Sequence, residues 1–574
     1  MRKILVGIFS ALALITLMSR SQAKAAIPPD LPASYLPHLP GDINGNGQVN
    51  GVDIVYGVNY LKGTGNPPPH VATTCFGTSS FYIDADVNGN GAFNGIDITY
   101  FVRYLKGQIS ILLYYTGCYR DSVQITDASI LPGQNVTFYS DTTYILNGFV
   151  FVDSGAVLTI QPGCVIKGHP GQGANASALL VARFGKIIAD GTVDAPIVMT
   201  GSVDWSDSMG AVPVDLEGSW GGLLILGCAS TNNPGNLKNI EGIPETEPRG
   251  AYGNGANPPI DDDSSGVLRY ISVRHGGSII GANNEINGIS LGAVGSKTVL
   301  DYIEVFGNLD DGIEFFGGNA HIKHAISVFN DDDNIDTDEG YHGRIQFYMA
   351  LQNPALLRGN RGGEWDGGVD VEDAQPYSNP HLANITFIGS GADSNNTDND
   401  WGVMWRDYAM GSFYNSIITE YKKRGIDFGD GTSGPPTKYN FIPNPDPLSP
   451  YQNADSMKVH YTLWSHFGLA PDGNRYDMFR ADNLVDTAVA DHMMDPNFHN
   501  QILLAPVLNS ISWGRDHNLD PRYNGSAGLN PGNAYPDDPW FSDAPYYGAF
   551  NPDTNAPLWT DGWTYLSKLG FTQH

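Results

Sequence analysis

The stretch NLDDGIEFFGGNAHIKHAISVFNDDDNIDTDEG, residues 308–340, carries most of the information about how this chain folds. Between Asp310 and Glu339 it holds nine carboxylates and a single lysine, and Ile, Phe and Val stand at alternate positions. Such alternation is typical of strands with one buried face, and a flexible acidic tail would lack it. We therefore expect strands that present acidic side chains on an ordered surface.

The same pattern recurs about every 23 residues. Ile303, Ile326 and Met349 are 23 residues apart, and GIEF at Gly312 has four counterparts: GISL from Gly288, NIDT from Asn334, GGEW from Gly362 and GIDF from Gly425. This period is typical of a parallel β-helix, whose coils bury a continuous core only by stacking. A β-sandwich would also have short strands, but not this register. We predict a mainly β chain with a right-handed parallel β-helix over residues 133–430.

The chain from about Gly133 to its end also resembles a group of secreted bacterial β-helix proteins related in fold to the pectate lyases. The resemblance rests on DDGIEFFGG at residues 310–318, a following acidic turn at 336–343 and an aromatic stretch from Gly548 to Leu566. It implies the fold and secretion, but no general activity.

An internal duplication at an offset of 44 residues lies nearer the N-terminus. DINGNGQVNGVDIVYGVNYLKG from Asp42 repeats as DVNGNGAFNGIDITYFVRYLKG from Asp86, and each copy runs from a polar loop into an amphipathic helix. Oxygen-bearing side chains stand where an EF-hand loop binds calcium. The expected ligands are Asp42, Asn44, Asn46, Asn50 and Asp53, then Asp86, Asn88, Asn90, Asn94 and Asp97, with the backbone carbonyls of Gln48 and Ala92.

No helix pattern precedes either loop, and residues 41–108 resemble a duplicated dockerin type I module. The resemblance implies calcium as the cofactor and a cohesin-bearing scaffold protein as the partner. At loop positions 10 and 11 the family often has hydroxyl residues that recognise the partner, whereas this chain has Gly51-Val52 and Gly95-Ile96. The resemblance therefore extends to calcium more directly than to cohesin.

Charge and the first residues limit the possible partners. The formal net charge is −30, from 61 acidic and 31 basic residues, which disfavours nucleic acid and anionic membranes and favours divalent cations. A basic start, an apolar run from Ile4 to Met18 and Ala23-Lys24-Ala25 predict a signal peptide over residues 1–25. No later uncharged stretch is long enough to span a membrane. We expect a secreted protein, extracellular or at the cell surface.

Between and beyond these modules we expect linkers and a cap. The predicted segments are a linker at 26–40, a second linker at 109–132 and an aromatic-rich C-terminal cap at 431–574. The cap is expected to close the open end of the solenoid, and a sugar-stacking platform is the alternative for its aromatic residues. The four cysteines allow three pairings. Cys75 with Cys118 would brace the second loop, and buried thiols are an equal alternative for Cys75, Cys118, Cys164 and Cys228.

Strand alternation places Ile313 and Phe315 in the core and Glu314 on the outer surface. Stacked coils lie about 4.8 Å apart, so acidic side chains in register repel one another unless a cation or a basic group lies between them. We predict an acidic stripe that binds calcium or faces carbohydrate. Its candidate residues are Asp310, Asp311, Glu314, Asp332, Asp333, Asp336, Glu364, Asp366 and Asp427. The alternative is that Asp and Asn merely suit tight turns, and that the acids are solvated.

Catalysis is a second hypothesis for the same face. Glycoside hydrolysis needs two carboxylates, and a calcium-assisted lyase needs acidic ligands together with a basic side chain. The candidates are Glu314, Asp336, Glu364, Asp366, Arg344 and Arg361, none of which stands in a recognisable motif. We favour a calcium-binding β-helix protein with a carbohydrate-associated binding or scaffold role. A polysaccharide lyase or glycoside hydrolase delivered by its dockerin is the alternative, and a structural filament or adhesin is the third.

Overall fold

The computed structural model divides into two compact units, one formed by residues 1–120 with 204–212 and the other by 121–203 with 213–574. The described residues are 41–46, 48–69, 71–73, 80–82, 84–88, 93–108, 112, 121–204, 214–281, 284–355, 358–368, 371–396, 401–429, 436–451, 456–528 and 531–572. The expected signal peptide, the linker 26–40, Cys75 and Cys118 lie outside them. Cys164 and Cys228 are buried thiols with no disulfide between them.

The first unit consists of two helices and a short antiparallel pair of strands: α2 (Gly51–Leu61), β1 (Val71–Thr73), β2 (Ser80–Tyr82) and α3 (Gly95–Leu105). Each helix begins after an asparagine, Asn50 or Asn94, whose side chain accepts a backbone N–H of the first turn. Asp53 and Asp97 complete a capping box at the two helices. Apolar side chains of the helices and loops form the core: Ile43, Ile54, Val58, Ile98 and Phe101.

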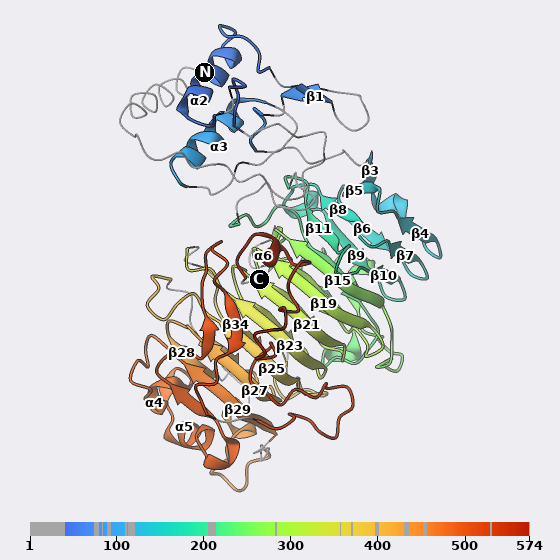
Figure 1. Cartoon of the computed structure of the whole chain (residues 1–574). Coiled ribbons are helices and arrows are strands. Elements are labelled where there is room, and N and C mark those ends of the chain that lie inside the picture. Colours follow the sequence, from blue (N-terminus) through green and yellow to red (C-terminus); the bar gives the residue numbers. More distant parts are fainter. Residues whose placement is uncertain are drawn as a thin grey trace. The chain divides into compact units, whose positions relative to one another are not determined.

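The second unit is a stack of coils whose parallel strands form two long sheets (Figure 1). The first sheet contains β3 (Asp121–Ile125), β4 (Asn135–Phe138), β5 (Thr142–Leu146), β7 (Val157–Ile160), β8 (Val165–Gly168), β10 (Lys186–Asp190), β11 (Ile197–Gly201), β15 (Gly266–Arg274), β19 (Val299–Phe306), β21 (His321–Val328), β23 (Arg344–Leu351), β25 (His381–Ile388), β27 (Gly411–Thr419), β29 (Met457–Ser465) and β32 (Gln501–Leu503). From β15 to β27, each strand pairs in parallel with the equivalent strand of the next coil.

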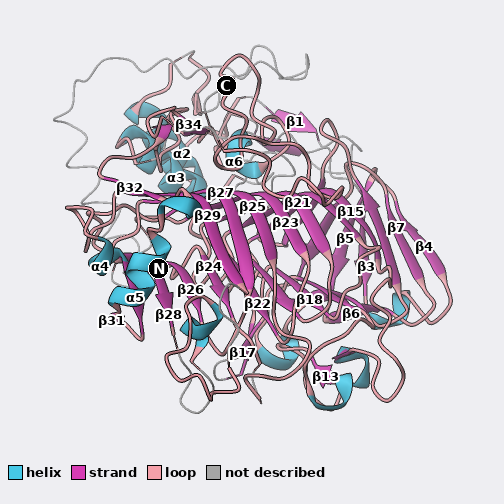
Figure 2. Ribbon diagram, turned by 90° about the horizontal axis from the view of Figure 1, so that it is seen from below, coloured by secondary structure: helices cyan, strands magenta, loops and turns pink. Residues whose placement is uncertain are grey.

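The second sheet runs beside the first along the stack (Figure 2). It contains β6 (Phe149–Val152), β9 (Ala178–Val181), β12 (Leu223–Leu226), β18 (Ile289–Gly292), β20 (Ile313–Phe316), β22 (Ile335–Asp338), β24 (Gly363–Trp365), β26 (Trp401–Trp405), β28 (Arg424–Phe428) and β30 (Phe479–Ala481), with β31 (Leu484–Val485) antiparallel at its end. The predicted mainly β fold, a parallel β-helix preceded by a small helical module, is confirmed.

A residue in the left-handed conformation bends each long strand of the first sheet, so that every coil has three faces. Tyr270, Tyr302, His324 and Phe347 have φ between 47° and 59°, and the backbone pairing between strands skips them. Such a φ is unfavourable for a bulky residue. Stacking of the rings compensates, because successive ring centroids lie 4.4, 4.4 and 4.9 Å apart.

The interior of the coils is a continuous apolar core. Ile313 and Phe315 of β20 are fully buried in it, as the alternation predicted. Ile335 of the next coil and Ile345 across the coil join the same core. Because a one-residue slip would turn every side chain to the opposite face, this core fixes the register of the outward residues.

The C-terminal segment differs from the expected cap. Its aromatic residues, including Tyr547, Phe550 and Tyr565, do not lie over the end of the stack. They pack along the outer side of the first sheet, against Phe306 and Val328 among others. Strands of the first sheet end in apolar side chains that point outward, such as Phe306, Val328 and Leu351. The C-terminal segment covers these side chains and removes them from water. Trp563 is buried and the indole N–H of Trp559 donates to the Ala549 carbonyl, so these two rings serve packing, whereas Trp540 and Tyr546 are half-buried.

Polar contacts attach this segment to several coils. Glu304 is fully buried and accepts the backbone N–H groups of Tyr565 and Leu566 at 2.7 and 2.9 Å, at the start of α6 (Tyr565–Lys568). Lys323 donates to the Trp540 carbonyl at 2.5 Å. The segment also forms the antiparallel pair β33 (Leu508–Ser510) and β34 (Asp520–Tyr523).

The β-helix is longer than predicted. It begins with β3 inside the predicted linker 109–132, and it continues past residue 430 through β29 and β32. Two helices, α4 (Arg475–Met478) and α5 (Thr487–Met493), pack at the last coil, and three side chains of α5 enter the core. These helices, and not the aromatic segment, occupy the place predicted for a cap.

Short elements lie in the connections between coils. They are β13 (Lys238–Asn239), β14 (Ala251–Tyr252), β16 (Ile279–Gly281) and β17 (Asn284–Glu285), with the 3-10 helices η3 (Asp127–Ser129), η4 (Gly173–Asn175), η5 (Pro234–Asn236), η6 (Pro248–Gly250), η7 (Thr437–Asn440) and η8 (Pro496–Phe498). Within the described part of the chain, no helix has the length and the apolar character needed to cross a membrane.

Candidate functional site

The acidic side chains of the repeat lie on the outer surface of the second sheet. Glu314, Asp336 and Glu364 are in register on β20, β22 and β24, as predicted. Asp427 of β28 is in register with the same column, but Met404 of β26 stands between it and Glu364 and interrupts the row of acids. We call the surface formed by six of these residues the acidic face: Asp311, Glu314, Asp333, Asp336, Glu364 and Asp366.

Backbone N–H groups hold the turn that precedes these strands. The Asp311 carboxylate accepts the N–H of Asp333 at 2.9 Å, and the Asp333 carboxylate accepts the N–H of Arg361 at 2.6 Å. Each carboxylate therefore joins its own coil to the next. Asn287 of the preceding coil likewise accepts the N–H of Asp311 at 3.2 Å, so a short acceptor, Asn or Asp, recurs before these strands.

Two arginines neutralise one half of the acidic face. Arg361 forms ion pairs with Asp333 and Glu364 at 3.1 and 2.6 Å. Arg406 forms ion pairs with Asp366 and Glu364 at 2.6 and 3.2 Å. These carboxylates therefore have basic partners within the fold.

The other half has no such partners. Asp311, Glu314 and Asp336 each place one carboxylate oxygen within 4.8 Å of the other two, and no lysine or arginine of the described chain forms an ion pair with them. We call these three residues the inner cluster. The buried Oδ1 atom of Asp336 makes no hydrogen bond, and Glu314 accepts one from the Asn287 amide. Burial, and then the neighbouring charges, raise the pKa of all three carboxyls well above the usual range.

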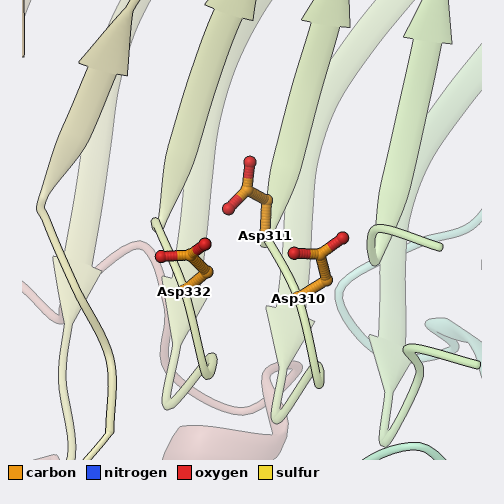
Figure 3. Close-up of side chains that lie close together, drawn as sticks. All are labelled: Asp310, Asp311 and Asp332. Carbon is orange, nitrogen blue, oxygen red and sulfur yellow. The ribbon is translucent and has the colours of Figure 1, made fainter. Parts of the chain in front are cut away.

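An open pocket of about 490 Å³ lies next to the inner cluster. Asp310, Asp311 and Asp332 place carboxylate oxygens within 4.8 Å of one another there, and Figure 3 shows Asp332 on the coil beside the other two. We call these three residues the pocket cluster. Burial and nearby carboxylates raise the pKa of Asp310 to about 8, and burial and Asp333 raise that of Asp332 to about 6. The pocket is lined by Ile279, Glu285, Leu309, Asp310, Asp331, Asp332 and Asn360.

Several residues of this site were missed by sequence reasoning. Glu285 and Ile279 belong to the connection before β18, and Glu241 comes from the 227–265 loop, so none follows the repeat. Burial and the charge of Glu285 raise the pKa of Glu241 to about 7. Glu339 anchors the same loop, because it accepts hydrogen bonds from Asn233, Lys238 and Tyr252. The only signal in the sequence for Glu241, Glu285 and Glu339 was their acidic character, and Ile279 had none.

The basic residues predicted for a lyase are not available on the acidic face. Arg344 begins β23 in the first sheet, where its Nε lies 2.6 Å from an oxygen of Asp538 and its side chain contacts His321. Arg361 is on the acidic face but is held by its two ion pairs. Of the six predicted catalytic residues, the structure brings together Glu314, Asp336, Glu364, Asp366 and Arg361, and it leaves Arg344 elsewhere.

The two predicted calcium loops form the other group of acids. Asp53 is fully buried and accepts the N–H groups of Asn44 and Asn50 at 3.2 and 3.0 Å, and Asp42 accepts that of Asn46 at 2.9 Å. Burial raises the pKa of Asp53 to about 6. Asp42 is buried as well, and its charge adds to the rise in the pKa of Asp53; two buried carboxylates in one loop with the Asn side chains fit calcium.

The second loop repeats the geometry of the first. Asp97 is fully buried, accepts the N–H groups of Asn88 and Asn94 at 3.3 and 2.9 Å, and has its pKa raised to about 7 by burial. Asp86 is buried beside it. Asn90 and Ala92 lie outside the described residues, while Gln48 of the first loop lies within them.

Comparison with protein families identifies a domain over each unit. Residues 131–441, more than half of the chain, match the family described as pectate-lyase like beta helix domain. The chain belongs to this family. Residues 40–106 match the dockerin type I domain. The comparison with curated proteins and the comparison with solved structures gave no match.

Both resemblances drawn from the sequence are thereby confirmed. The dockerin match agrees with the predicted module at 41–108, and the pectate-lyase-like β-helix match extends eleven residues beyond the predicted end of the solenoid at 430. Type I dockerin domains bind calcium, and a dockerin implies interaction with a cohesin-bearing scaffold.

Proposed function

We propose that this chain is an extracellular, carbohydrate-binding member of the pectate-lyase-like β-helix family that its dockerin attaches to a cohesin-bearing scaffold. The β-helix would bind an acidic polysaccharide through calcium held in the acidic pocket. The observation that supports this proposal is that two residues of the pocket cluster, Asp310 and Asp332, line an open pocket beside carboxylates that have no basic partner. A uronate carboxylate would be repelled by this pocket unless a cation lay between them.

Three features favour binding over catalysis. The arginines of the acidic face are held in ion pairs, so they are poor candidates for removing a proton. Arg344 lies in the other sheet. Each of the three pocket carboxylates places one oxygen within 4.8 Å of the other two, an arrangement that suits a shared cation.

The dockerin would contact its partner through apolar side chains at the start of its helices. Val52 and Ile96 occupy equivalent positions of α2 and α3 and are 61% and 64% exposed. Hydroxyl residues often stand there in the family. We therefore propose a cohesin partner with an apolar recognition patch. Replacing both residues by Ser should change the preferred cohesin without changing the calcium content, as measured by binding to a panel of immobilised cohesins.

Affinity electrophoresis in gels that contain polygalacturonate, alginate or neutral xylan tests the carbohydrate proposal. The full chain should be retarded by a uronate polymer in calcium, but not in EDTA and not by xylan. Asp310→Asn and Asp332→Asn should each weaken the retardation. Asp427→Asn, on the same sheet but outside the pocket, is the matched control and should behave as the parent chain does.

The same mixtures report on the alternative function. Unsaturated chain ends, followed by their ultraviolet absorbance, would indicate a lyase, and new reducing ends alone would indicate a hydrolase. Either product, lost in Asp332→Asn and kept in Asp427→Asn, would replace the binding role by catalysis. Equal retardation with and without calcium would contradict the role of the cation.

A further inference from the structure

One residue joins the two carboxylate clusters of the acidic face. Asp311 contributes an oxygen to the pocket cluster with Asp310 and Asp332, and to the inner cluster with Glu314 and Asp336. A carboxylate has two oxygens and about four lone-pair sites, so it can bind two cations and one backbone N–H together. The arrangement is therefore that of a bridging ligand between two neighbouring positions.

The inner cluster has an unsatisfied oxygen that points to a ligand. Asp336 Oδ1 is buried and accepts no hydrogen bond, although its neighbours Asp311 and Glu314 are themselves buried. A buried carboxylate oxygen without a donor or a cation is strongly unfavourable. Neither nearby arginine forms an ion pair with Asp336, because Arg361 and Arg406 pair with the carboxylates of the neutralised half of the face.

A second buried oxygen without a hydrogen bond lies at the pocket cluster. The amide oxygen of Asn360 is buried and makes no hydrogen bond, and Asn360 lines the pocket with Asp310 and Asp332. Carboxylate and amide oxygens together are the ligands that calcium prefers. Ligand atoms around one calcium ion lie at most about 5 Å apart, since each is about 2.3 to 2.6 Å from the ion. The separations within both clusters, up to 4.8 Å, fit this limit.

We propose that the acidic face holds a pair of divalent cations, with calcium as the first candidate, bridged by the Asp311 carboxylate. The inner cation is bound by Asp311, Glu314 and Asp336 and ties β20 to β22. The pocket cation is bound by Asp310, Asp311 and Asp332, with the Asn360 amide, and it keeps positions open to water. Only the part played by the pocket cation in carbohydrate binding rests on the proposed function, and the inner cation is independent of it.

Calcium stoichiometry of the full chain, measured by equilibrium dialysis without any polysaccharide, tests the pair. The dockerin loops contribute equally to every variant, so the differences report on the acidic face. Relative to the parent chain, Asp311→Asn should lose two calcium ions, whereas Asp336→Asn and Asp332→Asn should lose one each. Asp427→Asn should lose none. If Asp311→Asn does not fold, the double variant Asp332→Asn with Asp336→Asn should lose two.

Equal stoichiometry in the parent chain and all these variants would overturn the proposal, and would mean that the carboxylates are held neutral by protons. A loss of only one ion in both Asp311→Asn and the double variant would overturn the bridged pair. Parallel dialysis against magnesium shows whether the sites take a smaller divalent cation.

Thermal unfolding of the β-helix separates a cation site from a merely acidic cluster. In EDTA, Asp336→Asn should melt at the same temperature as the parent chain or higher, because one of three repelling charges is gone. In calcium the order should reverse, because only the parent chain gains the inner cation. A variant that stays above the parent chain in calcium as well would contradict the inner site.

These measurements remain separate from the proposed function. Asp336→Asn should lose one calcium ion and keep its calcium-dependent retardation by polygalacturonate. Asp332→Asn should lose one calcium ion and also show weaker retardation. If the chain binds the two calcium ions but no polysaccharide, the cation pair stands and the carbohydrate role is refuted.

Discussion

The dockerin loops and the acidic face both collect buried carboxylates, but they do so in opposite ways. In the first dockerin loop all the acids lie within twelve residues, and Asp53 accepts backbone N–H groups from its own loop. On the acidic face, Asp311 and Asp333 accept N–H groups from the following coil, and Asp336 meets Glu314 only because two strands stack in register. The first kind of site depends on local sequence, and the second depends on the register of the whole solenoid.

The largest expected effect comes from a change beneath the acidic face. Ile313 and Phe315 are fully buried under it, so Phe315→Ala should destabilise the β-helix by about 3–5 kcal/mol. The cavity would shift β20 against β22 and weaken calcium binding at the inner cluster. Denaturant unfolding with calcium dialysis measures both. Calcium bound by the dockerin should not change, and a loss there would mean that the two kinds of site are coupled.

Removal of a buried counter-charge should have the next largest effect. Arg361 is 15% exposed in its side chain and pairs with Asp333 and Glu364, so Arg361→Met should cost about 3 kcal/mol by leaving buried Asp333 without an ion pair and Glu364 with Arg406 alone. Calcium should restore part of the lost stability, because the variant frees the Asp333 carboxylate to bind a cation. Unfolding in EDTA and in calcium gives the two values. Arg269→Met, which removes a more exposed ion pair with Asp190, serves as the comparison.

A smaller effect is expected in the dockerin. Asp97 caps α3 and is a predicted calcium ligand, so Asp97→Asn should weaken the helix by about 1 kcal/mol and release one calcium ion. The inner and pocket clusters should keep theirs. Circular dichroism and calcium dialysis measure the change, and the equivalent Asp53→Asn in the first loop should give the same result. Unequal losses would show that the two loops are not functionally equivalent.

The smallest effect concerns pH, away from the acidic face. Burial, and then Arg344, lower the pKa of His321 to about 4, below its usual value near 6.5. The unfolded chain therefore binds this proton more readily, and stability should fall as the pH drops from 6.5 towards 4. With allowance for partial exposure, the loss between pH 7 and pH 5 should be about 1 kcal/mol. His321→Asn should remove this component from the pH dependence of unfolding, and an unchanged dependence would assign it to other groups.

The part of the fold that follows a period was predictable from sequence. The 23-residue repeat placed Ile313 and Phe315 inside and aligned Glu314 with Asp336 and Glu364, because a stacked coil repeats its register. The dockerin loops were predictable for a different reason, because all the expected ligands of one loop lie within twelve consecutive residues. Asp427 also stands in this column, but the repeat period did not reveal that Met404 of the coil between separates it from Glu364.

The rest of the site depends on the path of the long loops that connect the strands of successive coils. Nothing local indicates that Glu285 and Asn360 meet at one pocket, or that Arg406 reaches Asp366 from the next coil. The aromatic residues after Trp540 look alike whether they close an end or lie along a side. Their position is set by the apolar outer strip of the first sheet, which is a property of many coils together.

The C-terminal segment that lies along this strip also determines the order in which the molecule can be completed. Phe306, Val328 and Leu351 belong to coils that are synthesised well before the residues that cover them. A chain that ended before Trp540 would leave much of this apolar strip uncovered beside ordered strands, which is a surface prone to association. We therefore expect proteolytic loss of the residues from Trp540 onward to make the β-helix associate with itself through this strip.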